Sequence, residues 1–381
     1  MKIAFATFYD LNNIKKGSGT YYNIYMELLN QNHKVFPIGP LDVSFPFLSK
    51  LFRYIAKRVL KKRYRSYQDP FVGYAIGKQI NSFLKSLDYD FLLTNDYTIA
   101  GYTKINKPIV LWTDAVFPVD YKKNIHPRLD NLPWFSVYFC QKVIKQALMN
   151  IDLCIVPADW NYKEVFNYNI IDHNKIKKIS FGSNMKDPGP KVSQERNFDK
   201  IIQKKEIDIL FIGIDWKRKG GDIAIEVVRR LNKKGYQARL SIVGDYDKSI
   251  EGKFINNYGY LDKKISSDLE KLDSLYRDSD ILLLPSSIEG FGIAFVEAAS
   301  YGLPSLGFNN TGVSTAVKNG KSGLLIGGNE SPHQFVQIII SLFENPNKYN
   351  DLVNGSRSHY EDIYNWTSCV KRFSKLVENT F

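Results

Sequence analysis

The residues from 281 to 301 constrain the fold of this chain more than any other stretch. They begin with the apolar run Ile281–Leu284, which is typical of a buried parallel strand. A turn with two glycines, Gly290 and Gly292, follows, and then a helical pattern that ends before Gly302. A strand, a glycine turn and a helix start in this order point free backbone N–H groups at an anion.

Two carboxylates lie in the same stretch, Glu289 in the turn and Glu297 about one turn into the helix. Because the start of a helix favours a phosphate, we expect these carboxylates to bind hydroxyl groups instead. The stretch therefore predicts a site for a phosphate joined to polyols, as in a nucleotide sugar.

The bulk properties predict two globular domains. At 381 residues the chain is too long for one ordinary hydrophobic core.

The net charge of the chain, +13, fits either biased composition or an anionic partner. Three scattered cysteines predict neither a disulfide framework nor a zinc site and fit a reducing cytosol. The first apolar run is too short for a signal peptide, and no run approaches the ~18 apolar residues of a membrane span.

The first half of the chain repeats the pattern of an apolar run followed by a polar segment. Gly17 and Gly19 open a helix after the first run, where α/β folds bind ligands, although a tight turn without a ligand is equally open. Asp114 follows another run and is a candidate site residue, although a capping role for it is equally open. The predicted strands are 2–8, 35–38, 91–94, 108–112, 151–156 and 175–180.

A second α/β pattern begins after a polar, proline-containing stretch that we interpret as a linker. Its loop at 216–221 carries Arg218 and Lys219 beside paired glycines, which suits a phosphate, although a basic surface loop with no ligand is the alternative. The predicted strands here are 207–212, 239–243, 281–284, 303–308 and 323–326. We therefore expect an N-terminal domain over 1–187 with the helix 360–381, a linker over 188–204 and a C-terminal domain over 205–359.

Residues 47–65 have the most unusual composition, with eight Lys or Arg and no acidic residue. Leu48, Leu51, Phe52, Ile55 and Val59 fall on one helical face, with basic residues on another. This pattern is typical of a helix lying on an anionic membrane surface. The alternative is a helix packed on its own domain with a solvated basic face. Nucleic acid is not expected, because no known binding motif accompanies the patch.

Taken in their order along the chain, the segments described above resemble those of the glycosyltransferase family 4 type of GT-B enzyme, and the resemblance covers nearly the whole chain. EGFGIAFVE matches the family's E-x7-E motif with Glu289 and Glu297. FIGIDWKRKGG and NGKSGLLI resemble segments of the family's nucleotide domain, and IVLWTDAVF, IVPADW and KIKKISFGSN resemble N-domain signatures of a bacterial subgroup. The resemblance implies a GT-B fold, in which two Rossmann-like α/β/α domains face each other across a cleft and the last helix returns to the N-domain.

The resemblance also implies roles for individual residues. Lys219 and Arg218 would hold the diphosphate with the N–H groups of Gly292 and Ile293. Glu297 would bind the ribose and Glu289 the transferred sugar, so that Glu289, Asp114 and Lys219 form the catalytic set. The chain departs from the family at Gly213-Ile214, where relatives often have Arg after the glycine, and at Asp114, where many have His. The donor-binding set is Gly17, Gly19, Arg218, Lys219, Gly244, Tyr260, Leu261, Glu289, Phe291, Gly292, Ile293 and Glu297.

The expected activity is retaining, metal-independent transfer of a sugar from a UDP- or GDP-sugar to a glycan, lipid or other hydroxyl acceptor. Fixed cations and a helix start suit the charge of a leaving nucleoside diphosphate, so we expect no metal and no cofactor. We interpret the formal DxD at 245–247 as a turn. The alternatives are a non-catalytic nucleotide-sugar or glycan-binding protein and a GT-B epimerase. The expected location is cytoplasmic, at the inner membrane face if 47–65 binds lipid.

Overall fold

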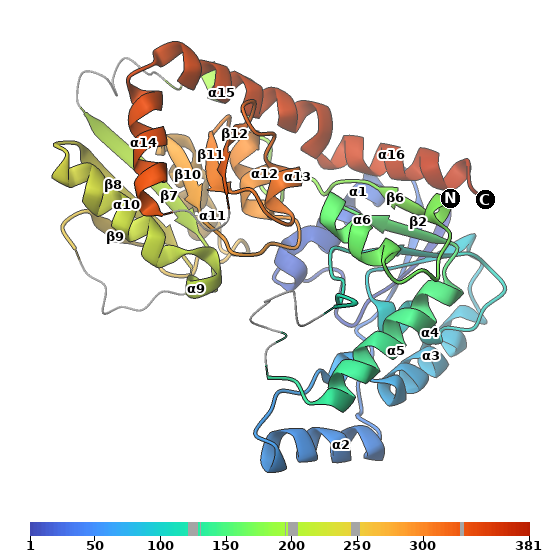
Figure 1. Cartoon of the computed structure of the whole chain (residues 1–381). Coiled ribbons are helices and arrows are strands. Elements are labelled where there is room, and N and C mark those ends of the chain that lie inside the picture. The colour runs from blue at the N-terminus through green and yellow to red at the C-terminus, as the bar shows by residue number, and fades with distance from the viewer. Residues whose placement is uncertain (121–128, 130, 195, 197–204, 245–251, 328–330) are drawn as a thin grey trace. The chain divides into compact units, whose positions relative to one another are not determined.

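The computed structural model describes residues 1–120, 129, 131–194, 196, 205–244, 252–327 and 331–381. The chain divides into two compact units (Figure 1). Unit 1 comprises Met1–Ser180 with Val370–Phe381, and unit 2 comprises Phe181–Cys369. Each unit contains one six-stranded sheet whose strands are all parallel, which confirms the predicted class of two Rossmann-like α/β halves.

The sheet of unit 1 has the strand order β2-β1-β3-β4-β5-β6. Every residue of its central strands β3, β4 and β5 is buried. Helices cover both faces of such a sheet, so its strands carry unbroken apolar runs. The strands are β1 (Lys2–Ala6), β2 (Lys34–Ile38), β3 (Phe91–Thr94), β4 (Ile109–Trp112), β5 (Leu153–Val156) and β6 (Ile176–Lys178).

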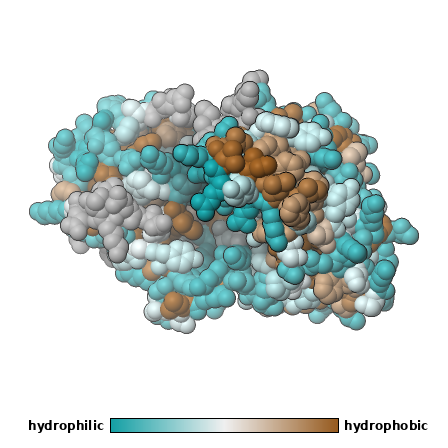
Figure 2. Space-filling view, turned by 90° about the horizontal axis from the view of Figure 1, so that it is seen from below, coloured by the Kyte–Doolittle hydropathy of each residue, from teal (hydrophilic) through white to brown (hydrophobic). Residues whose placement is uncertain are grey.

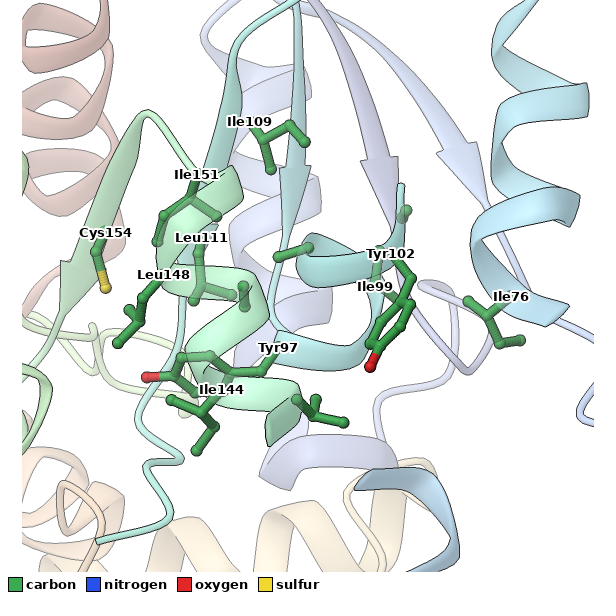
Figure 3. Packing of buried hydrophobic residues seen from close by; sticks show 14 of the residues in the cluster. Ile76, Tyr97, Ile99, Tyr102, Ile109, Leu111, Ile144, Leu148, Ile151 and Cys154 are labelled. Atoms are coloured by element: carbon green, nitrogen blue, oxygen red, sulfur yellow. The ribbon is translucent and has the colours of Figure 1, made fainter. Parts of the chain in front are cut away.

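The helices of unit 1 complete its main core. Leu111 of β4 lies among Ile144 and Leu148 of one helix and Tyr97 of another (Figure 3). The helices are α1 (Thr20–Asn30), α2 (Phe47–Tyr54), α3 (Pro70–Leu84), α4 (Tyr97–Tyr102), α5 (Trp134–Asn150) and α6 (Asp159–Phe166), with the shorter turns η1 (Lys16–Gly19), η2 (Ile55–Val59), η3 (Ser66–Gln68) and η4 (His173–Lys175). The last helix, α16 (Trp366–Glu378), enters unit 1 at Val370, and its Phe373 stacks on Trp112 of β4 with centroids 5.0 Å apart.

The sheet of unit 2 has the order β12-β11-β10-β7-β8-β9. Its central strand β10 is fully buried, as the run Ile281–Leu284 predicts. The strands are β7 (Glu206–Ile212), β8 (Gln237–Val243), β9 (Ile255–Asn257), β10 (Ile281–Leu284), β11 (Ser305–Phe308) and β12 (Gly323–Ile326). The helices are α7 (Lys191–Gln194), α9 (Trp216–Lys219), α10 (Gly221–Lys233), α11 (Ser266–Asp278), α12 (Ile293–Ser300), α13 (Val313–Ala316), α14 (Pro332–Phe343), α15 (Pro346–His359) and η5 (Tyr360–Tyr364).

The predicted helix over 47–65 is shorter in the structure. It is α-helical to Tyr54, π-helical to Val59 and then ends, with Lys61 at a φ of +51°. The chain beyond the helix is held by residue 131: Arg63 N–H donates to Asn131 O, and Asn131 Nδ2 donates to Lys61 O. A tertiary contact therefore ends this helix where the local pattern would continue it.

None of the helices within the described residues is both long enough and apolar enough to cross a membrane.

Candidate functional site

The candidate phosphate site of unit 2 is built from loops at the carboxyl ends of neighbouring strands. β7 lies between β10 and β8 in the sheet, so the segments after these three strands meet at one edge. The closest approach is at Gly244, where φ is +136° and a Cβ atom would lie 1.9 Å from Gly213 O. A side chain at Gly244 would therefore force the loops after β7 and β8 apart.

Glu289 lies between the two basic residues that the sequence singled out. Its Oε1 atom is 2.7 Å from Lys219 Nζ and 3.3 Å from Arg218 Nη1, and its side chain is 8% exposed. Burial alone would raise the pKa of Glu289, but the charges of Lys219 and Arg218 outweigh it and lower the pKa below its usual value. Glu289 is therefore a carboxylate. Asp215 also pairs with Arg218, with its Oδ2 atom 3.1 Å from Arg218 Nε, so each of the two cations has a carboxylate partner.

The backbone holds Lys219 and Arg218 against this loop. The carbonyl of Arg218 accepts a hydrogen bond of 2.8 Å from Ser287 N–H, and Arg218 Nη1 donates to Ile288 O at 2.8 Å. Gly220 ends α9 at a φ of +77°, and a Cβ atom there would lie 2.3 Å from Pro285 O. Gly220 therefore serves close packing between the basic loop and the segment after β10, whereas a Cβ atom at Gly221 would lie 2.3 Å from the ring of Trp216.

The start of α12 supplies the backbone donors that the sequence predicted. Gly292 caps the helix with a φ of +96°, and Ile293 is its first residue. Within the described part of the chain, the N–H groups of Gly292 and Ile293 have no hydrogen-bond partner. The side chain of Phe291 is turned away into the core, where its ring contacts those of Phe181 and Tyr364. The first two amides are thus available to an anion.

Glu297 is buried further along α12 and is held from two directions. Tyr276 donates a hydrogen bond of 2.8 Å to its Oε2 atom, and Lys263 forms an ion pair with its Oε1 atom. Tyr276 stacks on Tyr301 with centroids 5.0 Å apart. The sequence analysis did not single out Lys263 or Tyr276, because both lie in ordinary polar and amphipathic segments without a motif.

The predicted base-binding segment lies between Gly244 and Glu297. Gly244 N–H donates to Gly259 O at 2.9 Å, just before Tyr260, which is 56% exposed. Leu261 is half-buried, and Lys263 follows two residues later. The structure thus brings together most of the predicted residues of unit 2, whereas the side chain of Phe291 points away from them into the core. The residues brought together are Arg218, Lys219, Gly244, Tyr260, Leu261, Glu289, Gly292, Ile293 and Glu297.

The predicted residues of unit 1 form a second cluster, at the carboxyl ends of β1, β3 and β4. Gly17 has a φ of +56°, and a Cβ atom there would lie 2.8 Å from the ring of Tyr21. The Tyr21 hydroxyl is 3.5 Å from Asp114 Oδ1. Burial, and then the charge of Asp114, raise the pKa of Tyr21 well above its usual value. Gly19 caps α1 behind Gly17 at a φ of +86°.

Other polar residues surround Asp114 that the sequence analysis did not name. Asn95 Nδ2 donates to the Tyr9 hydroxyl at 2.9 Å, and Asn161 Nδ2 donates to Asp114 O at 2.9 Å. The side-chain oxygens of Asn95 and Asn161 are buried without a hydrogen-bond partner among the described residues. The signal that could have found them is their position directly after or near a buried strand end.

Among the described residues there is no group of three or more His, Cys, Asp or Glu side chains that could hold a metal ion. The DxD sequence at 245–247 lies outside the described residues.

Comparison with known proteins finds a family model that matches the part of the chain that carries the site of unit 2. The family model described as "Glycosyl transferases group 1" matches residues 192–359, which include every predicted site residue of unit 2. The chain is 27% identical over 235 residues to an uncharacterised 41.2 kDa protein in the cps region of Klebsiella pneumoniae, a stretch that covers 60% of this chain and 57% of the relative. It is 22% identical over 253 residues to the D-inositol 3-phosphate glycosyltransferase of Corynebacterium glutamicum, covering 63% of this chain and 60% of the relative.

The chain therefore spans less than two thirds of the length of these curated relatives. The fold is matched over a longer stretch. The crystal structure of Anabaena HepE in complex with UDP and glucose has a TM-score of 0.64 at 14% identity, covering 99% of each chain. Such a likeness shows the fold, and that fold is GT-B. Residues 192–359 of this chain thus match the model of the glycosyl transferases group 1 family, and the chain has a GT-B fold.

Proposed function

We propose that this protein is a glycosyltransferase that moves a sugar from a UDP- or GDP-sugar to a hydroxyl group of a glycan or a lipid-linked acceptor. The observation that supports this most is the contact of Glu289 with Lys219 and Arg218, beside the unpartnered N–H groups of Gly292 and Ile293. The family match over 192–359 and a structural neighbour bound to UDP and glucose support the same class of donor.

Each group of the site has a part in this proposal. Lys219, Arg218 and the start of α12 bind the diphosphate, because all three present positive charge on a partly buried surface. Glu297 binds the ribose hydroxyls with its orientation fixed by Tyr276 and Lys263. Glu289 contacts the transferred sugar, and Tyr260 with Leu261 line the base pocket.

In the proposed reaction the bond between the anomeric carbon and the β-phosphate oxygen breaks, and the nucleoside diphosphate leaves with the electron pair. The acceptor oxygen bonds to the anomeric carbon on the same face, and its proton passes to the departing phosphate. Negative charge therefore develops on the phosphate as the bond breaks, where fixed cations and N–H dipoles stabilise it. We propose that these groups replace a metal ion, so activity should be equal with and without a chelator.

Unit 1 supplies the second part of the proposal. Asp114, Tyr21 and Asn95 form a polar cluster in which Asn95 Oδ1 has no hydrogen-bond partner among the described residues, which suits a hydroxyl group of a sugar. Gly17 keeps the backbone next to this cluster free of a side chain, whereas a Cβ atom at Gly19 would lie against Ile14 and Asn23. We propose that Asp114 contacts the transferred sugar or the acceptor during turnover.

The proposal is tested by screening UDP- and GDP-sugars for thermal stabilisation and then following release of the nucleoside diphosphate. A donor at ~100 times its dissociation constant should stabilise the protein by ~2.7 kcal/mol. Replacing Glu289 with Ala should lower turnover by about 100-fold or more while some donor binding remains. Glu270→Ala, at an exposed carboxylate on α11, is the matched control and should change neither quantity. Binding without turnover by the wild-type protein across all donors and acceptors would favour a non-catalytic nucleotide-sugar-binding protein instead.

A further inference from the structure

The helical segment formed by α2 and η2 has apolar residues on two sides. On its inner side Phe52 packs against Phe135 and Phe139 of α5, with ring centroids 5.3 and 5.0 Å apart. Ala56 is fully buried in the same small cluster. The segment is therefore attached to unit 1 without using the remaining apolar side chains.

The outer side of the segment leaves large apolar side chains in solvent. Phe47 is 78% exposed, Leu51 41% and Tyr54 61%. On an α-helix, residues at positions i, i+4 and i+7 lie on one face. The structure therefore divides the single apolar face that the sequence predicted: Phe52 and Ile55 pack inward, whereas Leu51 is exposed on the outer side.

The neighbouring helix α5 adds two aromatic side chains that the sequence analysis did not include. Trp134 is 77% exposed and Tyr138 is 54% exposed, and they are one turn apart. Each is in ring contact with a residue that packs on Phe52: Trp134 with Phe135, and Tyr138 with Phe139. We call the exposed side chains Phe47, Leu51, Tyr54, Trp134 and Tyr138 the aromatic face.

Unbalanced positive charge lies beside the aromatic face. Residues 47–65 contain no acidic residue, and Lys50, Lys57, Arg58, Lys61 and Lys62 form no ion pair with any described residue. α2 is the lowest element of unit 1 in Figure 1, so its outer side points toward the viewer in Figure 2. There, apolar side chains lie directly next to hydrophilic ones.

We propose that the aromatic face and its adjoining basic residues dock unit 1 onto an anionic lipid surface. Exposed Trp and Tyr beside Phe and Leu suit the boundary between headgroups and acyl chains, and unpaired Lys and Arg suit anionic headgroups. This inference deepens the proposed function, because it places the enzyme where a lipid-linked acceptor would be found.

The charge distribution disfavours the other occupants. A second copy of the chain would bring the same basic residues against themselves, so like charges would repel. A nucleic acid would pair with the cations but leave Phe47 and Leu51 without an apolar partner. An anionic bilayer satisfies both the charges and the apolar side chains.

The test is sedimentation of the full chain with phosphatidylcholine vesicles that contain either no anionic lipid or about one third phosphatidylglycerol, at low and high salt, without any nucleotide. The protein should bind the anionic vesicles and be released by salt. Lys57→Gln with Arg58→Gln should weaken binding about fivefold for each charge removed. The matched control is Lys78→Gln with Lys85→Gln, which changes an exposed lysine of α3 and the exposed lysine that caps its end, and it should bind as the wild type does.

The apolar contribution is tested separately. Leu51→Glu should abolish vesicle binding. The control is Phe83→Glu, which should not change binding. Phe83 is exposed on α3, 12 residues after Phe71, the residue of α3 that stacks on Phe52. Vesicles should shift the tryptophan emission to shorter wavelength, and Trp134→Phe should remove the shift. Equal binding to neutral and anionic vesicles, no binding at low salt, or tighter binding to an oligonucleotide than to vesicles would overturn the inference. UDP-dependent thermal stabilisation of the same variants reports separately on the proposed function and should be unchanged.

Discussion

At the scale of single residues, the site of unit 2 depends on the hydrogen bonds and ion pairs that fix its buried carboxylates. Glu297 has Tyr276 on one oxygen and Lys263 on the other, and both carboxylate and phenol are almost fully buried. Burial and the neighbouring carboxylate raise the pKa of Tyr276 well above its usual value, so the phenol keeps its proton and donates the hydrogen bond.

Tyr276→Phe should therefore destabilise the protein by about 1–3 kcal/mol, because a buried charged acceptor loses its donor. It should also weaken nucleotide binding, since Glu297 is no longer fixed for the ribose. Denaturant unfolding and titration with UDP measure the two effects.

Tyr301→Phe is the matched control for this prediction. Tyr301 stacks on Tyr276 but donates its hydrogen bond to Asp273 Oδ1 at 2.7 Å. It should lower stability to a similar degree and leave the affinity for UDP unchanged. Equal loss of affinity in both variants would mean that Tyr276 acts only through packing.

At the scale of secondary structure elements, the strands were easier to predict than the helix ends. A strand such as β10 is specified by its own apolar residues, whereas helix ends depend on contacts elsewhere. The predicted helix over 360–381 is interrupted at Asn365, whose Oδ1 accepts the N–H of Ser368 at 2.8 Å and starts α16 anew. That cap is a local signal that the sequence contains. The end of η2 depends instead on Asn131, which no local pattern reveals.

The start of β10 gives a pH-dependent prediction that is separate from the site. Burial raises the pKa of Asp280 to about 7, while its Oδ2 atom accepts the N–H of Asp208 at 2.8 Å. The folded state therefore binds a proton that the unfolded chain releases above pH ~4. The stability linked to this group is complete below pH ~4 and is lost as the pH rises to about 7.

Asp280→Asn should remove this part of the pH dependence, because the amide accepts the same hydrogen bond and carries no charge. Unfolding free energy measured from pH 4 to 8 should fall less steeply for the variant than for the wild type. Asp280 lies at the amino end of β10, away from the carboxyl ends that carry the site, so UDP affinity should be unchanged. A slope equal to that of the wild type would show that Asp280 is not the titrating group.

At the scale of the whole molecule, the chain is two units with the same kind of parallel sheet, each with its own polar cluster at the carboxyl ends of its strands. The sequence predicted the glycines, Lys219, Glu289 and Asp114, because strand, turn and helix patterns mark those positions. It did not predict Tyr9 or Lys263. These residues enter the clusters through the order of the strands and the path of the loops, which motifs do not encode.

The proposed roles of the two units, nucleotide binding by unit 2 and sugar or acceptor contact by unit 1, lead to a prediction for Asp114. If unit 2 binds the nucleotide and unit 1 contacts the sugar or the acceptor, Asp114→Asn should lower kcat by at least about 10-fold and leave the affinity for UDP unchanged. Steady-state kinetics and UDP titration measure the two quantities. Asp172→Asn, an exposed cap of η4 in the same unit, is the control. Loss of UDP affinity in Asp114→Asn would contradict this division.

The central claim is that Lys219 stabilises the leaving diphosphate of a sugar donor, and one comparison of variants tests it most directly. Sugar transfer or donor hydrolysis is measured for the wild type, for Lys219→Met and for Lys217→Met, an exposed neighbour on the same short helix. The account predicts a loss in kcat/KM of about 100-fold or more for Lys219→Met, since one fixed cation at the developing charge is removed. It predicts less than about a twofold change for Lys217→Met. Equal activity of the two variants would contradict the account.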